Sequence, residues 1–226
     1  MKLLDRIRLW EEDKREYELS FTNNPYLIAE IGVNHESSLE NAKKLCKNAK
    51  DSGANAAKFQ TYKADKIASK DAVAYWDLKE NKVENQKELF SKYDSFDEKD
   101  YRELSRYCKE IDIEFMSTPF DTDCLDWLDE LVEVFKISSS DITNKPLIEY
   151  ISKFNKPIIL STGASSIKEI KRAVSWIDLP QTKIMLLHCI LSYPTKKEDA
   201  NLGMINDLKF NFPKIKIGYS DHTEPG

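Results

Sequence analysis

The chain has 226 residues, of which 41% are hydrophobic and 32% are charged, a balance typical of an ordinary globular protein. A net charge of −5 argues against a nucleic-acid-binding surface built on overall positive charge. No stretch approaches the roughly 20 apolar residues that a membrane helix needs. The first residues also lack the apolar core of a secretory signal. We therefore expect a cytoplasmic protein with no membrane partner.

The four cysteines lie far apart and form no CxxC pair. They are Cys46, Cys108, Cys124 and Cys189. Most fall in segments predicted to be helical, where a cysteine acts as a small buried hydrophobe. A metal or redox role is the alternative interpretation.

Seven short apolar runs alternate with amphipathic segments along the chain. The runs cover residues 26–32, 56–62, 113–117, 134–138, 157–162, 183–189 and 214–219. Several are continuously hydrophobic, which is typical of parallel strands buried on both faces.

Capping residues indicate where the intervening helices begin. The capping-box spacing occurs in three pairs: Ser37 with Glu40, Ser95 with Glu98, and Ser166 with Glu169. Two further helices are predicted from Thr122 and from Asn144, and Gly53 is expected to end the first helix.

This alternation of strand and helix predicts a parallel sheet. It fits either a (β/α)8 barrel of the TIM type, truncated before its eighth strand, or an open doubly wound sheet. The chain has no GxGxxG or Walker loop, which open sheets commonly use to bind phosphate. Polar residues also end nearly every strand, as expected when a ring of strand ends forms the site. Both observations favour the barrel.

The segment 63–95 interrupts the alternation and is longer than a typical strand-to-helix loop. Two interpretations stand equally: a cover over bound substrate, or an excursion packed on the surface.

Two lysines, Lys58 and Lys136, lie inside apolar strands. A lysine there snorkels outward, pairs with a carboxylate, or meets an anionic ligand, because an unpaired buried ammonium is costly. Hydroxyl residues follow the same strands, among them Ser139 and Ser220. Lysines, hydroxyls and backbone N–H groups near glycine turns form phosphate sites, although serines at such positions also cap helices.

The chain has three histidines, His35, His188 and His222, and all lie at or just after predicted strands. Taken alone, each fits a structural role better than metal ligation, because no His/Glu pair with the spacing of the HExxH motif is present.

Six motifs in chain order carry a resemblance to a known family. They are AEIGVNH at 29–35, KFQT at 58–61, STPF at 117–120, FKISS at 135–139, LSTG at 160–163 and GYSDHT at 218–223. Together they resemble the sialic acid synthase family, the phosphoenolpyruvate-condensing synthases of N-acetylneuraminate, legionaminate and related nonulosonic acids. The resemblance makes residues 25–226 a synthase-type barrel domain and residues 1–24 an N-terminal extension.

The resemblance implies a role for each matching residue. Phosphoenolpyruvate would be bound by Lys58, Thr118, Lys136, Ser139, Ser161 and Ser220. An acylated amino-sugar would be bound by Gln60, Asp141 and Tyr193. Glu30 would be the catalytic acid and base, and His222 would bind a divalent metal, Mn²⁺ first, with Mg²⁺ or Co²⁺ as alternatives.

The implied reaction is the metal-dependent condensation of phosphoenolpyruvate with an aldehyde resembling N-acetylmannosamine, with release of phosphate. The full-length protein would be a homodimer whose barrel is followed by a small antifreeze-like domain. That domain, and the family's second metal-binding histidine on the eighth strand, have no counterpart in this sequence. Relatives also often read His-Cys-Thr-Asn/Ser where this chain has residues 188–191 as HCIL, and glutamate where it has Asp141.

Two other hypotheses follow from these departures. One is a catalytically dead barrel that binds phosphoenolpyruvate or a sugar as a regulatory protein or as a fragment. The other is a different phosphoenolpyruvate aldol synthase, making octulosonate or heptulosonate phosphates. That chemistry requires a further basic site for a phosphorylated sugar, and the sequence offers no candidate for it.

Overall fold

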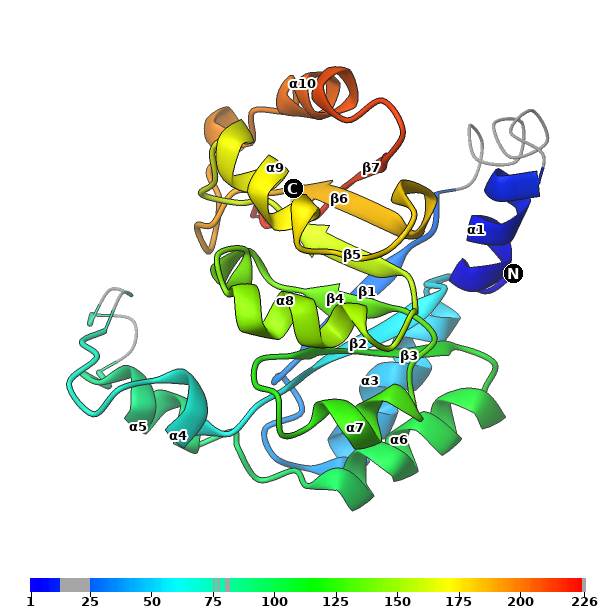
Figure 1. The fold of residues 1–226 in the computed structure, drawn as a ribbon. Helices are drawn as coiled ribbons and strands as arrows, with labels where there is room; N and C mark the ends of the chain where they lie inside the picture. The colour runs from blue at the N-terminus through cyan, green and yellow to red at the C-terminus, as the bar shows by residue number, and fades with distance from the viewer. Residues whose placement is uncertain (13–24, 75, 77, 80–81, 225–226) are drawn as a thin grey trace. The chain divides into compact units, whose positions relative to one another are not determined.

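The computed structural model describes residues 1–12, 25–74, 76, 78–79 and 82–224 (Figure 1). The chain divides into two compact units. One spans Pro25–Val132, and the other comprises the described residues of Met1–Asn24 and of Glu133–Gly226. Each unit contains one parallel sheet, so we call them the three-stranded unit and the four-stranded unit.

The three-stranded unit is built on β1 (Ile28–Gly32), β2 (Ala56–Thr61) and β3 (Glu114–Pro119), hydrogen-bonded in that order and all parallel. Every residue of β3 is buried, and so is nearly all of β2. The helices α3 (Leu39–Asp51) and α6 (Glu98–Glu110) pack on this sheet and on each other, and α7 (Leu125–Asp129) follows β3 (Figure 1). Apolar strands covered by helices explain the continuous hydrophobic runs of the sequence.

The four-stranded unit is built on β4 (Phe135–Ile137), β5 (Ile158–Ser161), β6 (Ile184–His188) and β7 (Lys216–Tyr219), again parallel and in chain order. Its helices are α8 (Lys145–Ser152), α9 (Ile167–Ser175) and α10 (Met204–Asn211), with short 3-10 turns η1 (Ser139–Asp141), η2 (Gln181–Lys183) and η3 (Lys197–Asp199). The first helix, α1 (Leu3–Glu12), belongs to this unit and contacts η2.

All seven predicted strands are present, and each begins and ends within about two residues of its prediction. Two of the five predicted helix starts are confirmed by their caps. The Ser166 side chain accepts from the Glu169 N–H at the start of α9, and Asn144 caps α8 by accepting from the Leu147 N–H.

The other three predicted starts are wrong. Ser37 has a φ of +63°, whereas an N-cap residue is extended, so Ser38 caps α3 instead. Asp97 forms the capping box of α6, so the N-cap lies two residues after the predicted Ser95. After Thr122, α7 begins only at Leu125 and has no side-chain cap.

The segment 63–95 contains two short helices, α4 (Ala64–Ile67) and α5 (Gln86–Ser91), which contact each other. An antiparallel bridge between Val73 and Asn85 joins its two arms. The segment is therefore locally folded in its described part.

All four cysteines are buried and free, which confirms their interpretation as small core residues. The Cys46 and Cys108 sulfurs lie 3.6 Å apart where α3 meets α6. In the described part of the chain, no helix is long and apolar enough to cross a membrane.

Gly53 ends α3 in a Schellman motif, as the sequence predicted. Its N–H donates to the Lys50 carbonyl, and the Ala54 N–H donates back to the Ala49 carbonyl. These bonds require the left-handed conformation, and Gly53 has a φ of +87°. Glycine adopts this conformation without the steric penalty of a Cβ.

Replacing Gly53 with alanine is expected to lower the free energy of unfolding by about 1 kcal/mol, because an L-residue is strained in the left-handed region. Gly203→Ala is the matched control. A Cβ would meet nothing within 4 Å at either glycine, but Gly203 has a φ of −57°. Urea unfolding of both variants separates the cost of a side chain in the left-handed conformation from the cost of adding a methyl group. Equal losses of stability would contradict a left-handed helix end at Gly53.

Candidate functional site

The residues predicted for the site fall into two groups, one in each unit. The three-stranded unit holds Glu30, Lys58, Gln60 and Thr118. The four-stranded unit holds Lys136, Ser139, Asp141, Ser161, Tyr193, Ser220 and His222. All lie on strands or in the segments that follow them, so the two groups are described in turn.

In the three-stranded unit, the strand register brings all four side chains to one face of the sheet. Glu30 pairs with Lys58, and Gln60 pairs with Thr118. Paired residues of parallel strands point to the same side, and residues two apart on one strand do so as well. The carboxylate, ammonium, amide and hydroxyl therefore share one surface.

The Lys58 ammonium forms an ion pair with the Glu30 carboxylate on this face. The Lys58 side chain is 11% exposed and that of Glu30 is 48% exposed, so the buried cation has its counter-ion at the solvent edge. A Cβ added at Gly32 would lie 3.4 Å from Glu30 Oε1 and 3.6 Å from Gln60 Nε2. The polar ends of both side chains thus lie against this glycine.

In the four-stranded unit, Lys136 is buried and its ammonium donates to Ser161 Oγ at 2.6 Å and to the Ile137 carbonyl at 2.8 Å. Lys136 pairs with Ile159 in the register, two residues before Ser161. The lysine and the serine therefore project from the same face of adjacent strands. This places a cation and a hydroxyl where the sequence predicted an anion-binding site.

Ser139 lies in η1 directly after β4, and it is not a helix cap. Ser138 caps that turn by accepting from the Ser140 N–H. Ser139 Oγ instead accepts from the Gly163 N–H at 2.9 Å and lies 3.1 Å from Cys189 Sγ. Both contacts are buried, so the hydroxyl is held from two sides.

His222 is oriented by backbone and side-chain contacts after β7. Its Nδ1 lies 2.9 Å from the Ile190 carbonyl, and its Nε2 lies 3.3 Å from Ser220 Oγ. A carbonyl can only accept, so Nδ1 carries the proton and Nε2 presents a lone pair. Tyr193 is 63% exposed, and its ring lies against the imidazole at a tilt of 38°, with ring centroids 4.3 Å apart.

This tautomer suits His222 to metal ligation, because ligating histidines usually donate their other N–H to a carbonyl or carboxylate. One ligand does not make a complete site. Among the described residues, no group of three or more His, Cys, Asp or Glu side chains is placed to hold a metal ion.

Asp141 is half-buried in η1, and burial raises the pKa of its carboxyl above the usual range. Hydrogen bonds from the Asn144 amide, at 3.3 Å, and from the Ser140 hydroxyl, at 3.4 Å, oppose that shift. The carboxylate is thus fixed by neighbours on its own turn.

Comparison with known proteins identifies the family. Residues 45–226 match the NeuB family. The chain belongs to this family. The N,N'-diacetyllegionaminic acid synthase of Campylobacter jejuni is 42% identical over 203 residues, which are 87% of this chain and 60% of that protein. The corresponding synthase of Legionella pneumophila is 37% identical over 206 residues, 88% of this chain and 57% of that protein.

Solved structures agree. The N-acetylneuraminic acid synthetase of Leptospira borgpetersenii is 38% identical, with a TM-score of 0.75 over 89% of this chain and 66% of that chain. A truncated 3-deoxy-D-arabino-heptulosonate 7-phosphate synthase of Thermotoga maritima shares the fold alone, at 14% identity and a TM-score of 0.61. The α/β barrel class is therefore confirmed, and this NeuB-family chain spans between 55% and 60% of the length of its first curated relatives.

The contacts of His188 are those of a structural residue. Its Nε2 lies 2.9 Å from the Ala200 carbonyl, and its ring stacks on Tyr219. The Ser220 N–H donates to the His188 carbonyl. The histidine therefore packs the end of β6 against β7 and η3.

Several contributors to the two groups were missed by the sequence interpretation. The Ile190 carbonyl orients His222 and the Cys189 thiol contacts Ser139. A backbone carbonyl has no sequence signal. Cys189 did have one, since it directly follows β6, but the sequence interpretation gave it no part in the site.

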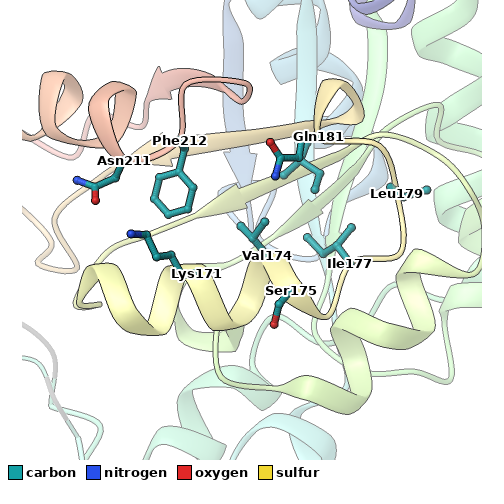
Figure 2. Close-up of a pocket in the computed structure, with 9 residues that line it drawn as sticks. Lys171, Val174, Ser175, Ile177, Leu179, Gln181, Asn211 and Phe212 are labelled. Atoms are coloured by element: carbon teal, nitrogen blue, oxygen red, sulfur yellow. The ribbon is translucent and has the colours of Figure 1, made fainter.

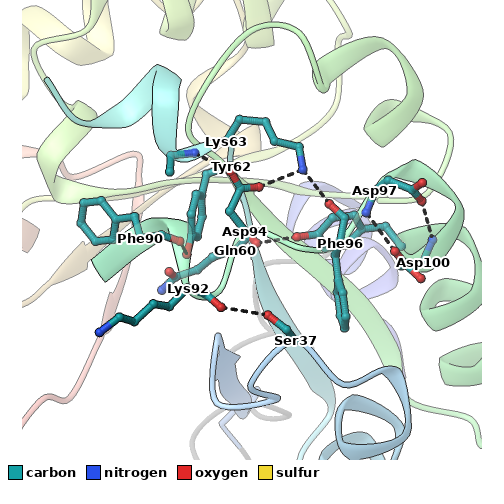
Figure 3. Close-up of polar contacts among 12 residues, drawn as sticks. Ser37, Gln60, Tyr62, Lys63, Phe90, Lys92, Asp94, Phe96, Asp97 and Asp100 are labelled. Atoms are coloured by element: carbon teal, nitrogen blue, oxygen red, sulfur yellow. Dashed lines mark hydrogen bonds and ion pairs between the residues drawn. The ribbon is translucent and has the colours of Figure 1, made fainter. Parts of the chain in front are cut away.

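The segment 63–95 is tied at its base to the three-stranded unit. Asp94 accepts from the Lys63 ammonium at 2.8 Å and from the Ala64 N–H at 2.7 Å, and Lys63 also donates to the Phe96 carbonyl (Figure 3). The Ser37 hydroxyl donates to the Lys92 carbonyl. These contacts close the segment into a loop with fixed ends, and its role as a substrate cover stays a prediction.

A groove of about 390 Å³ lies elsewhere, between α9 and α10 (Figure 2). Its walls include Val174, Ile177 and Phe212, and it reaches Ile184, the first residue of β6. None of the predicted site residues lines it. The groove lies at the amino end of β6, whereas the predicted site residues lie at the carboxyl ends of their strands. The groove is therefore separate from the candidate site.

His35, in the first family motif, is a neutral core residue. Its ring stacks on Phe96 with centroids 4.2 Å apart, and its Nδ1 accepts from the Ser37 N–H at 3.2 Å. Burial lowers the pKa of His35 below its usual 6.5. Between the folded and the unfolded pKa, the unfolded chain therefore binds more protons.

The contribution of His35 to the free energy of unfolding is therefore expected to be fully present above about pH 6.5 and to be lost as the pH drops below that value. His35→Phe keeps an aromatic ring against Phe96 and removes the titrating group. Both proteins are measured by urea unfolding from pH 8 to pH 5. The unfolding free energy of wild type minus that of His35→Phe should decrease as the pH falls, because only wild type loses the contribution of His35. A difference independent of pH would contradict a neutral buried His35.

Proposed function

We propose that the chain carries the phosphoenolpyruvate-binding barrel of a nonulosonic acid synthase. The observation that supports this most directly is the register of the two sheets. In each unit it places a buried lysine on the same face as polar side chains of its own or adjacent strands: Glu30, Gln60 and Thr118 beside Lys58, and Ser161 beside Lys136. Membership of the NeuB family points to the same activity.

The proposed reaction joins C3 of phosphoenolpyruvate to the aldehyde carbon of an N-acylated amino-sugar resembling N-acetylmannosamine. The new C–C bond forms as the aldehyde oxygen takes a proton. Water then adds to C2, and the bond between C2 and the phosphate oxygen breaks. Inorganic phosphate leaves, and C2 retains the oxygen supplied by water.

Each group of residues has a proposed part in this reaction. Lys58, Lys136 and the neighbouring hydroxyls bind the phosphate and carboxylate of phosphoenolpyruvate through charge-assisted hydrogen bonds. Glu30, ion-paired with Lys58, moves protons near the reacting carbons. Gln60, Asp141 and Tyr193 bind the sugar. Two substrates bound side by side react faster than free ones, because the entropy lost in bringing them together is already offset by binding.

We propose further that His222 Nε2 is one ligand of a divalent cation, Mn²⁺ first. A bound cation would supply Lewis acidity toward the aldehyde. The tautomer imposed by the Ile190 carbonyl supports this. Two remaining proposals, a homodimer and an N-terminal extension before the barrel domain of residues 25–226, rest on the family resemblance. A cytoplasmic location is proposed from the composition of the chain.

The second candidate function is a phosphoenolpyruvate-binding barrel without turnover. It is favoured because the described residues hold no group of three or more His, Cys, Asp or Glu side chains placed to bind a metal ion. Binding of phosphoenolpyruvate, with no phosphate released from it in the presence of any acylated mannosamine, would support this function over the first.

Lys136→Met should weaken phosphoenolpyruvate binding by roughly 10- to 100-fold, since it removes a charged donor and keeps an apolar side chain of similar length. Lys168→Met, at an exposed position on α9, is the matched control and should bind as wild type does. Calorimetry with phosphoenolpyruvate measures binding. Phosphate release with Mn²⁺ and N-acetylmannosamine or its 6-deoxy diamino analogues measures turnover. Wild-type protein that neither binds nor turns over would overturn the proposal for these substrates.

His222→Ala should weaken Mn²⁺ binding by roughly tenfold or more, because it removes a ligand whose orientation is already set. The loss of the free Mn²⁺ signal in electron paramagnetic resonance reports binding independently of turnover. His188→Gln is the control, since His188 contacts the Ala200 carbonyl and packs on Tyr219. Equal Mn²⁺ binding by wild type and His222→Ala would exclude His222 as a ligand.

A further inference from the structure

The Ser139 hydroxyl is the point where three carboxyl-terminal segments of the four-stranded unit meet. Ser139 follows β4, Gly163 follows β5 and Cys189 follows β6. The Gly163 N–H donates to Ser139 Oγ at 2.9 Å, and Cys189 Sγ lies 3.1 Å from the same oxygen. Ser139, Gly163 and Cys189 are buried, so water competes little for their hydrogen-bonding groups.

Close packing fixes the arrangement further. A Cβ added at Gly163 would lie 3.0 Å from Cys189 Sγ and 3.0 Å from Ser139 Oγ, with the Cys189 carbonyl at 3.3 Å. Real Cβ atoms rarely approach so closely, so a side chain at position 163 would require the thiol and the hydroxyl to shift. The distances leave the Ser139 side chain little freedom to turn.

A hydroxyl oxygen has two lone pairs and one proton. The Gly163 N–H occupies one lone pair of Ser139 Oγ. If the Cys189 thiol donates into the second lone pair, the oxygen can accept no more, and its own proton is left for another acceptor. A hydroxyl restricted to donating suits a phosphate or a carboxylate, which only accept when ionised.

We propose that Cys189 is a positioning residue for the anion-binding hydroxyl of Ser139. Its thiol donates to Ser139 Oγ and so directs the Ser139 proton toward bound phosphoenolpyruvate. The inference rests on the proposed function, because it takes phosphoenolpyruvate as the ligand. Residues 190 and 191 are isoleucine and leucine, so among residues 189–191 the thiol is the side chain with a proton to donate.

The test compares Cys189→Ala with Cys189→Ser in the full chain. Cys189→Ala removes the donor and should weaken phosphoenolpyruvate binding roughly three- to tenfold, as expected for the loss of one hydrogen bond. Cys189→Ser keeps a donor and should restore most of the affinity. In turnover assays the loss should appear in KM for phosphoenolpyruvate, with kcat changed less. Cys124→Ala, which removes another buried thiol, is the matched control and should bind as wild type does.

A double-mutant cycle separates positioning from a general loss of packing. If Cys189 acts through the Ser139 hydroxyl, Cys189→Ala should add little to the binding defect of Ser139→Ala. Equal losses in both backgrounds, or no loss from Cys189→Ala alone, would overturn the inference and leave the proposed function standing. Failure of the wild-type chain to bind phosphoenolpyruvate would instead overturn the proposed function itself.

Discussion

The register of the parallel strands is the constraint on which the candidate site depends. Side chains alternate between the two faces of a sheet, so a slip of one residue would move every polar side chain of a strand to the opposite face. In the three-stranded unit the observed register aligns Glu30 with Lys58 and Gln60 with Thr118. Burial of the apolar residues between them enforces it, because Phe59 would otherwise exchange places with its polar neighbours Lys58 and Gln60. The hydrophobic core thus determines where the polar groups are presented.

The two buried lysines are accommodated by different means, and the difference is chemically useful. Lys58 has a carboxylate partner in Glu30, which is half exposed. Lys136 donates to the Ser161 hydroxyl and to the Ile137 carbonyl, which are neutral acceptors. Moving a charge out of water is costly unless strong partners replace the solvent. The charge of Lys136 also interacts with the Asp141 carboxylate, and an anionic ligand would add a second negative charge there. At Lys58 it would compete with Glu30, which would then become available for proton transfer.

Backbone groups orient much of the chemistry in the four-stranded unit. The Gly163 N–H holds Ser139, and the Ile190 carbonyl determines which nitrogen of His222 is protonated. A backbone contact does not require a particular side chain at the position that supplies it. The apolar residues 190 and 191, which depart from the pattern of the family, are therefore compatible with a correctly oriented His222. Isoleucine and leucine offer no side-chain hydrogen bond to a ligand, so in the proposed site Cys189 acts through Ser139.

The sequence by itself determined the strands, their parallel arrangement and the residues that end them, because apolar runs and strand-end polarity are local patterns. It also identified the caps at Asn144 and Ser166, where the capping side chain and the helix are adjacent in sequence. Only the tertiary structure decided which side chains meet, since the contacts of Ser139 and of His222 join segments that the chain separates by tens of residues. The misplaced cap at Ser37 has the same origin. The turn after β1 holds that residue in a left-handed conformation that the local pattern does not reveal.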